Sequence, residues 1–141
     1  MGGTRPAEEI VADTSAIVAI AFAEPEREAF VQALERAERC LISSVSVVEV
    51  RMVVHGRRGQ RAVVLLDDLL RLPLFEIVPP GPAETDAAYA AFAAFGRGSG
   101  RAAGLNFGDV FSSALAKVRG LPLLYTGGDF SETDIASALN A

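Results

Sequence analysis

Four carboxylate residues have the clearest chemical potential in this sequence: Asp13, Glu49, Asp109 and Asp129. Asp13 ends an apolar run, Glu49 lies inside another, and Asp109 and Asp129 follow glycines in the strings NFGDVF and TGGDF. A carboxylate in apolar surroundings is costly unless it is paired or binds a cation. Hard divalent cations such as Mg²⁺ prefer oxygen ligands of this kind. If the fold gathers these residues, the chain is expected to be a metal-dependent hydrolase.

Asp13 and Asp109 each have an ordinary structural explanation as well. Asp13 precedes Thr14 and Ser15 and is suited to cap a helix that begins there. Asp109 follows Asn106 by three residues, so it suits the first turn of a helix, where the dipole favours negative charge. Taken singly, neither residue requires a catalytic role.

Glu49 and Asp129 differ in how easily structure alone explains them. Asp129 follows two glycines and is typical of a turn. Glu49 stands at the centre of V-V-E-V in an expected helix, and Arg51, two residues on, points to a different side of that helix. Glu49 is therefore expected to face a metal ion or an arginine from elsewhere.

Short apolar runs alternate with amphipathic segments along the chain. The expected strands are residues 9–13, 40–43, 75–79 and 121–126. The expected helices are residues 16–24, 25–38, 45–56, 60–72, 82–96, 106–120 and 131–139. Unbroken apolar strands between helices are typical of a parallel sheet covered on both faces. The sequence thus predicts a three-layer α/β/α fold with a central, mainly parallel sheet of four to five strands.

This topology places two of the carboxylates at one edge of the sheet. Ligands of parallel sheets gather beyond the carboxyl ends of the strands. Asp13 follows the first expected strand, and Asp129 lies just beyond the fourth. Glu49 and Asp109 belong to helices, so the tertiary fold must bring them to that edge.

Composition is that of one ordinary globular domain. The 141 residues are 50% hydrophobic and 22% charged. The one cysteine, Cys40, excludes an internal disulfide framework, fits a reducing compartment and is expected to be buried. No apolar stretch reaches the roughly 18 residues of a membrane span, and no secretory signal core is present. We expect a cytoplasmic protein with no membrane partner.

Other chemistries find little support in the sequence. The formal net charge of −5 argues against a globally basic nucleic-acid binder, although arginine clusters can act locally. His55 is the one histidine and has no accompanying G-x-S-x-G elbow. One cysteine and one histidine do not make a zinc site. The GRGSGR string lacks the lysine and Ser/Thr of a phosphate-binding loop.

Three strings resemble the PIN-domain ribonucleases, and most closely the VapC-type toxins of bacterial toxin–antitoxin pairs. These strings are VADTSAIVAI, SSVSVVEV and, at residues 104–135, GLNFGDVFSSALAKVRGLPLLYTGGDFSETDI. The resemblance covers nearly the whole chain after the first residues. We therefore expect residues 1–8 to form a flexible N-terminal lead and residues 9–141 to form a PIN-like nuclease domain.

The resemblance implies an endoribonuclease that uses Mg²⁺, with Mn²⁺ as a substitute. The four carboxylates fall on the acidic positions of the family. Asp13 and Asp109 are expected to bind the metal directly. Glu49 and Asp129 are expected to complete the catalytic site, through metal-bound water or by orienting the nucleophile. A cation would also relieve the repulsion among clustered acids.

Three further residues are expected to contact the RNA substrate: Ser15, Arg97 and Arg101. The sequence departs from many relatives at three other positions. They carry a lysine where Thr126 stands, an asparagine or acid where Gly128 stands, and a cysteine where Val110 stands. None of these departures removes a core acid.

The resemblance also implies protein partners. A cognate VapB-type antitoxin is expected to cover the acidic cleft and insert an arginine against the carboxylates. A homodimer is expected too. The helix that carries Tyr89, Phe92 and Phe95 is a candidate contact surface, and core packing explains its aromatic residues equally well.

Two other functional classes share some of these features. A catalytically silent PIN-like module would keep the fold and use its acids only to hold an arginine of a partner. A receiver-like phospho-accepting domain would need two adjacent acids after the first strand and a lysine after a late strand. This chain has the single Asp13 and, at the end of the last expected strand, Thr126. These residues disfavour the receiver-like class.

Overall fold

The computed structural model describes residues 8–96, 104–128, 130 and 133–140. The strands are β1 (Glu9–Ala12), β2 (Arg39–Ser43), β3 (Phe75–Val78) and β4 (Leu123–Leu124). The α-helices are α1 (Thr14–Ala21), α2 (Arg27–Arg36), α3 (Ser44–Arg58), α4 (Gln60–Leu70), α5 (Pro82–Phe95) and α6 (Phe107–Arg119). A 3₁₀ turn, η1, spans Ala138–Asn140. The described part of the chain contains no helix that is both long and apolar enough to cross a membrane.

All four strands run parallel in the order β3-β2-β1-β4. Val11 of β1 lies opposite Leu41 on one side and Leu123 on the other. The chain therefore adds β2 and β3 on one side of β1 and returns to add β4 on the other. Ligands of open parallel sheets bind where the strand order reverses in this way. The reversal places the end of β1, and hence Asp13, at the centre of the candidate edge.

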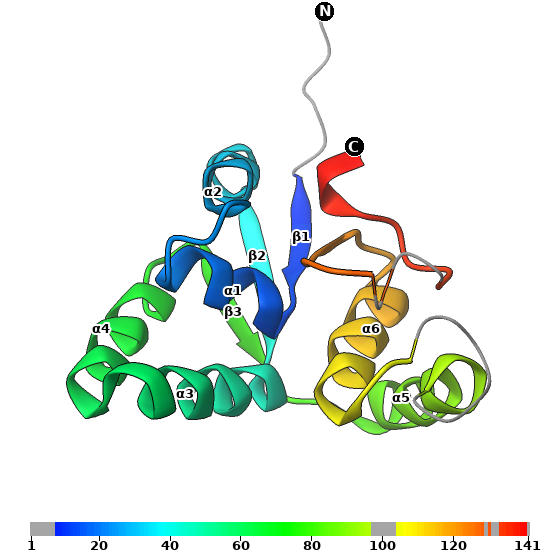
Figure 1. Ribbon diagram of the computed structural model, residues 1–141. Coiled ribbons are helices and arrows are strands. Elements are labelled where there is room, and N and C mark those ends of the chain that lie inside the picture. Colours follow the sequence, from blue (N-terminus) through cyan, green and yellow to red (C-terminus); the bar gives the residue numbers. More distant parts are fainter. Residues whose placement is uncertain (1–7, 97–103, 129, 131–132, 141) are drawn as a thin grey trace, which may run out of the picture.

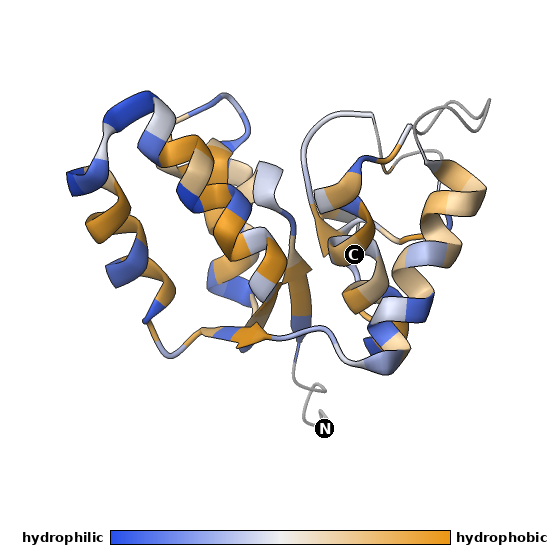
Figure 2. Ribbon diagram, turned by 90° about the horizontal axis from the view of Figure 1, so that it is seen from below, coloured by the Kyte–Doolittle hydropathy of each residue, from blue (hydrophilic) through white to orange (hydrophobic). Residues whose placement is uncertain are grey.

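The alternation of side chains along the strands divides the core in two. Ile10 and Ala12 of β1 pack with α1, α2, α3 and α4, whereas Val11 packs with α5 and α6. This division follows from the two-residue period of a strand. Figure 1 shows the two groups of helices on opposite sides of the sheet, and Figure 2 shows the mainly hydrophobic strands between them. The predicted three-layer α/β/α arrangement is confirmed.

Helices at the carboxyl edge of the sheet begin with polar caps. Asp13 caps α1 by accepting a hydrogen bond from the Ser15 N–H. Ser43 ends β2 and caps α3, because its hydroxyl oxygen accepts a hydrogen bond from the Val45 N–H at 3.2 Å. Such caps satisfy N–H groups that have no partner within the helix. The same residues thereby fix where α1 and α3 leave the sheet.

The prediction that a helix stops at Gly56 was wrong. Helix α3 continues to Arg58 and ends at Gly59, whose φ of +83° is the left-handed conformation that favours glycine. Gly56 remains helical inside α3, where a glycine costs only about 1 kcal/mol relative to alanine. The chain reversal into α4 is therefore made by Gly59.

The C-terminal helix predicted for residues 131–139 was also wrong over its described part. Residues 133–137 are not helical, and only the short turn η1 follows them. The N–H of Leu123 in β4 donates to the carbonyl of Ala136 at 2.9 Å, and Ser137 forms a parallel bridge with Leu123. The open edge of β4 thus holds this backbone extended, and β4 is shorter than the predicted strand of residues 121–126.

Candidate functional site

Asp13 lies directly beyond the carboxyl end of β1 and is only 2% exposed. Its Oδ2 accepts hydrogen bonds from the Ser15 N–H at 3.0 Å and from the Ser15 hydroxyl at 2.7 Å. Its Oδ1 is buried and has no hydrogen-bond partner among the described residues. Buried polar atoms nearly always have a partner. Asp13 therefore offers one fixed oxygen that suits a cation or a donor from another molecule.

Asp109 is held rigidly at the start of α6. It is 8% exposed, and its Oδ2 accepts a hydrogen bond from the Asn106 N–H at 3.0 Å. In return, the Asp109 N–H donates to the Asn106 side-chain oxygen at 2.9 Å. The sequence suggested an acid in the first turn of this helix, and the structure adds a reciprocal capping box with Asn106. The capping box also orients the carboxylate at the positive end of the helix dipole, where an acid is favoured.

Glu49 reaches the first turn of α6 from α3. A Cβ atom built on Gly108 would overlap both carboxylate oxygens of Glu49, so the carboxylate lies against the Gly108 backbone. Gly108 directly precedes Asp109 and is buried. The fold has thus brought Glu49 next to the turn that carries Asp109. Only a glycine at position 108 permits this approach without a shift.

Ser15 links the segments that follow β1 and β4, the two neighbouring strands at the centre of this edge. While its hydroxyl donates to Asp13, the same oxygen accepts a hydrogen bond from the Thr126 N–H at 3.0 Å. Thr126 follows β4 and leads toward Asp129. Ser15 therefore ties the segment after β4 to the carboxylate after β1.

The described residues do not form a complete metal cage. They contain no group of three or more His, Cys, Asp or Glu side chains placed to hold a metal ion. Mg²⁺ seldom needs such a cage, because it keeps several waters and binds through one or two carboxylates. Asp129, Arg97 and Arg101 lie outside the described residues, so their predicted roles stay predictions.

Sequence reasoning missed three residues around this site: Gly108, Ser46 and Ser112. Gly108 was visible only as part of the string NFGD, where a glycine before an acid is typical of a turn. Ser46 and Ser112 are fully buried and hydrogen-bonded to each other. No local pattern distinguishes them from other helical serines, since their partnership depends on how α3 meets α6.

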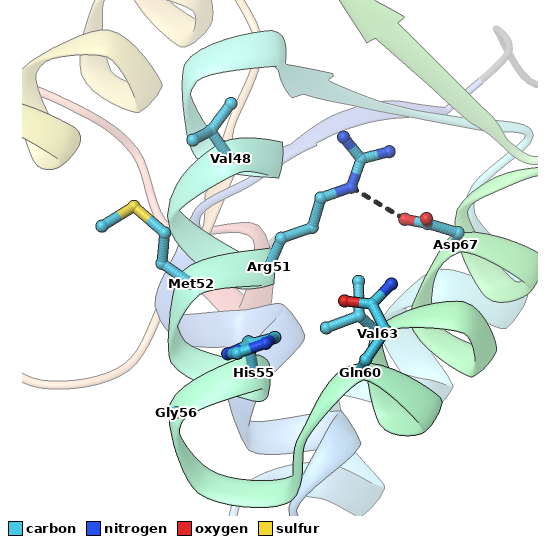
Figure 3. A pocket seen from close by; sticks show the side chains of 8 residues that line it. All are labelled: Val48, Arg51, Met52, His55, Gly56, Gln60, Val63 and Asp67. Carbon is cyan, nitrogen blue, oxygen red and sulfur yellow. Dashed lines mark hydrogen bonds and ion pairs between the residues drawn. The ribbon is translucent and has the colours of Figure 1, made fainter.

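The arginines near the end of α3 form a separate region. Arg51 pairs with Asp67 of α4 at 2.9 Å, at the side of a groove between α3 and α4 (Figure 3). Eight residues line this groove: Val48, Arg51, Met52, His55, Gly56, Gln60, Val63 and Asp67. The guanidinium groups of Arg57 and Arg58 lie over the Phe22 ring. Arg58 stands nine residues beyond Glu49, about 13 Å along the helix.

An apolar surface lies on the opposite group of helices. Tyr89 and Phe92 of α5 are 73% and 47% exposed, and Phe107 of α6 is 75% exposed. We call these three residues the aromatic surface. Phe95, in contrast, packs against the core on this side of the sheet. Core packing therefore explains Phe95 and leaves the exposure of Tyr89 and Phe92 unexplained.

Cys40 has no place in the site. It is buried in β2, and burial raises the pKa of its thiol to about 12, against a weaker opposing effect of a hydrogen bond from the Ala12 backbone. At neutral pH it remains a protonated thiol and not a nucleophile. The structural role predicted for it is confirmed.

Comparison with known proteins agrees with this architecture. The sequence matches the PIN domain family over residues 10–136. A protein named VapC ribonuclease Mb0640, from Mycobacterium bovis, is 42% identical over 128 residues, which cover 91% of this chain and 97% of that protein. A Mycobacterium tuberculosis protein named ribonuclease VapC28 is 40% identical over 131 residues, covering 93% of this chain and 98% of its own length.

A solved structure extends the likeness to three dimensions. The crystal structure of Mycobacterium tuberculosis VapC20, described as a sarcin-ricin loop cleaving toxin, has a TM-score of 0.75 at 18% identity. The match covers 90% of this chain and 96% of that one. At such low identity this likeness supports the fold, while the family follows from the sequence matches. The chain belongs to the PIN-domain family, among the VapC ribonucleases.

Proposed function

We propose that this protein is the toxin of a VapBC toxin–antitoxin pair and a Mg²⁺-dependent endoribonuclease that hydrolyses RNA phosphodiester bonds. The observation that carries the proposal is the buried Oδ1 of Asp13, which has no hydrogen-bond partner among the described residues. The contact of the Glu49 carboxylate with Gly108, the residue before Asp109, supports it. The relatives named VapC ribonuclease support the choice of RNA as substrate.

Asp13 and Asp109 are the residues that would hold the metal ion. Both are buried and accept hydrogen bonds, Asp13 from Ser15 and Asp109 from the Asn106 N–H. Their hard oxygen ligands suit Mg²⁺, with Mn²⁺ as a substitute. Bound there, the ion would polarise the phosphodiester and lower the pKa of a bound water.

The protein contributes preorganised geometry to this chemistry. Ser15 fixes the orientation of Asp13 before any ligand arrives, and the capping box does the same for Asp109. Such fixed groups need little rearrangement in the transition state. Glu49 and Asp129 would complete the site, either through water bound to the metal ion or by orienting the attacking water. Glu49 is suited to this because its carboxylate is half-buried beside the first turn of α6.

RNA is negatively charged, and so are the carboxylates of the site that it must approach. The chain carries a formal net charge of −5, so the phosphates need local positive groups. The bound cation would supply one. We propose that Arg97 and Arg101 supply others and that Ser15 contacts the phosphate or a water molecule. The second role of Ser15, as a link between Asp13 and Thr126, is compatible with this because a hydroxyl oxygen has two acceptor sites.

A VapB-type antitoxin is the proposed protein partner. One structural neighbour is VapBC2 from Rickettsia felis bound to a DNA fragment from the promoter of the pair, with a TM-score of 0.72 at 16% identity. An arginine from the antitoxin would donate hydrogen bonds to the same Asp13 Oδ1 that would bind the metal. Neutralisation would then be a competition between guanidinium and cation for one oxygen.

We also propose that the protein forms a homodimer through the aromatic surface. Large exposed aromatic side chains are typical of protein interfaces. Replacement of Tyr89 and Phe92 by serine should convert the dimer to a monomer in sedimentation experiments, whereas replacement of the exposed Val64 on α4 should not. A wild-type protein that sediments as a monomer at all concentrations would exclude this interface.

RNA cleavage with and without metal tests the proposed activity. We expect cleavage of a structured RNA with Mg²⁺ or Mn²⁺, none in excess chelator, and none by Asp13→Asn or Asp109→Asn. Glu35→Gln, which alters an exposed acid on α2, is the matched control and should cleave normally. Circular dichroism would verify that each variant is folded.

The silent binding module is the competing function. It predicts an antitoxin complex that forms normally and no metal-dependent cleavage by the wild-type protein. Cleavage that persists in chelator or in both aspartate variants would instead show that another group, or a contaminating nuclease, is responsible. Either result would end the proposal of a metal-dependent ribonuclease.

A further inference from the structure

A buried pair of serines joins the two helices that carry Glu49 and Asp109. Ser46 of α3 and Ser112 of α6 are both 0% exposed, and their hydroxyl oxygens lie 3.1 Å apart. A buried hydroxyl without a hydrogen bond destabilises a protein. Each serine hydroxyl is the hydrogen-bond partner of the other, although the two residues are 66 positions apart in the sequence. The pair is thus a specific polar contact between α3 and α6.

The serine pair lies one helical turn from the carboxylates. Ser46 precedes Glu49 by three residues, and Ser112 follows Asp109 by three. Residues three apart lie on the same side of a helix. Helices α3 and α6 therefore meet at two neighbouring points: the serine pair and the approach of Glu49 to Gly108.

The same turn of α3 is also connected to the Asp13 segment. The hydroxyl of Thr14, which follows Asp13, donates a long hydrogen bond of 3.5 Å to the Ser46 carbonyl. Thr14 is 8% exposed, so this contact is shielded from water. Ser46 is therefore the residue where the elements that carry Asp13, Glu49 and Asp109 meet.

Charge repulsion between α3 and α6 explains why the serine hydrogen bond matters. Glu49 and Asp109 are both negative, and their repulsion acts to separate α3 from α6 whenever no cation lies between them. Apolar contacts between helices have no directional preference and allow small sliding movements. A hydrogen bond between two short side chains fixes both distance and direction. The serine hydrogen bond therefore opposes this separation, and the absence of a side chain at Gly108 leaves room for the close approach.

We infer that Ser46 and Ser112 are positioning residues, which hold Glu49 at the correct distance from Asp109 for binding a divalent cation. The inference rests on the proposed metal-dependent function and deepens it. The serines touch neither metal nor substrate; they act through the helices. Their loss should weaken metal binding more than it impairs the chemistry once metal is bound.

Direct Mn²⁺ binding, followed by electron paramagnetic resonance on the full chain, tests this inference. We expect Ser46→Ala and Ser112→Ala each to raise the Mn²⁺ dissociation constant by about tenfold, the usual effect of losing a group that orients metal ligands. The double variant should resemble either single variant, because both remove the same bond. RNA cleavage should recover largely at saturating Mn²⁺.

Ser113→Ala is the matched control. Ser113 is a neighbouring serine of α6, 3% exposed, and it should bind Mn²⁺ as the wild type does. A purely structural role predicts lower melting temperatures with unchanged Mn²⁺ affinity, and this result would overturn the inference. So would a double variant whose loss equals the product of the two single losses. If the wild type itself binds no Mn²⁺, the proposed metal-dependent function fails first, and the role of the serines fails with it.

Discussion

Carboxylates at the carboxyl edge of the sheet and carboxylates on the outer surface have different partners. On the surface, Asp67 pairs with Arg51 and Asp134 pairs with Lys117, so the protein neutralises its own charge there. At the sheet edge, the Asp13 carboxylate accepts hydrogen bonds from an N–H and a hydroxyl, both of Ser15. Uncharged donors orient a carboxylate without cancelling its charge. The difference separates acids that pair with a cationic side chain of the protein from an acid whose charge is left uncompensated by its Ser15 donors, as the proposed cation site requires.

Mn²⁺ should therefore stabilise the protein through the sheet edge alone. At a free metal concentration of 100 times the dissociation constant, linkage predicts about 2.7 kcal/mol of added stability. For a domain of this size that corresponds to a rise in melting temperature of roughly 5–10 °C. Asp13→Asn should lose this response yet keep the stability of the metal-free protein, because asparagine caps a helix as well as aspartate.

Glu76→Gln supplies the surface control for that measurement. Glu76 lies on the outer strand β3 and pairs with Arg39 of β2. The Glu76→Gln variant should keep the whole Mn²⁺ response. Thermal unfolding with and without Mn²⁺ checks both variants. An equal rise in melting temperature for the wild type and Asp13→Asn would place the metal elsewhere.

The close approach of Glu49 to Gly108 should be broken by one methyl group. Gly108→Ala places a Cβ against the Glu49 carboxylate, so α3 or α6 must shift. Overpacking of this kind costs about 1–3 kcal/mol, and the displaced carboxylate should also lower RNA cleavage. Urea unfolding and cleavage rates measure the two effects.

Gly56→Ala makes the same chemical change where nothing lies within 4 Å of the added atom. Gly56 is exposed inside α3, so alanine should stabilise the protein by about 0.5–1 kcal/mol and leave cleavage unchanged. Stability changes of opposite sign in Gly108→Ala and Gly56→Ala would confirm that position 108 is constrained by Glu49. Destabilisation of equal size at both would refute it.

The sequence predicted the parts of this site that depend on local pattern. Apolar strand runs and helix-capping residues gave the α/β order, the parallel sheet and the position of Asp13, because these features are encoded within a few residues. The predicted helix cap at Asp13 and the predicted place of Asp109 in the first turn of a helix are confirmed. A capping role and a metal-binding role are compatible, since in Asp13 one oxygen caps α1 while the other has no partner among the described residues.

Features that depend on contacts between distant segments were missed. The Ser46–Ser112 contact and the approach of Glu49 to Gly108 arise only when α3 meets α6. The C-terminal helix was predicted wrongly because the edge of β4 holds the backbone of residues 136–137 extended. Local propensity gives no information on either event.

Ser15 tests whether uncharged donors are what orient Asp13. Ser15→Ala removes the hydroxyl hydrogen bond to Asp13 and leaves the Thr126 N–H without its acceptor, while the backbone hydrogen bond to Asp13 persists. We expect a loss of about 1 kcal/mol in stability and a decrease in cleavage of roughly tenfold. Ser15→Thr keeps the hydroxyl and should retain most of the activity. Full activity in the alanine variant would show that the backbone donor suffices.

The smallest effect is expected at the surface pair of Lys117 and Asp134. Their 2.7 Å contact joins α6 to the extended segment before η1, but both side chains are more than half exposed. Water and salt screen such pairs, so Lys117→Ala should cost less than about 1 kcal/mol and leave Mn²⁺ binding unchanged. The cost should shrink further at 1 M salt, where the screening length is only about 3 Å. Unfolding measurements at low and high salt would check this. A salt-independent loss would mean that the aliphatic stem of Lys117, and not its charge, holds the segment against α6.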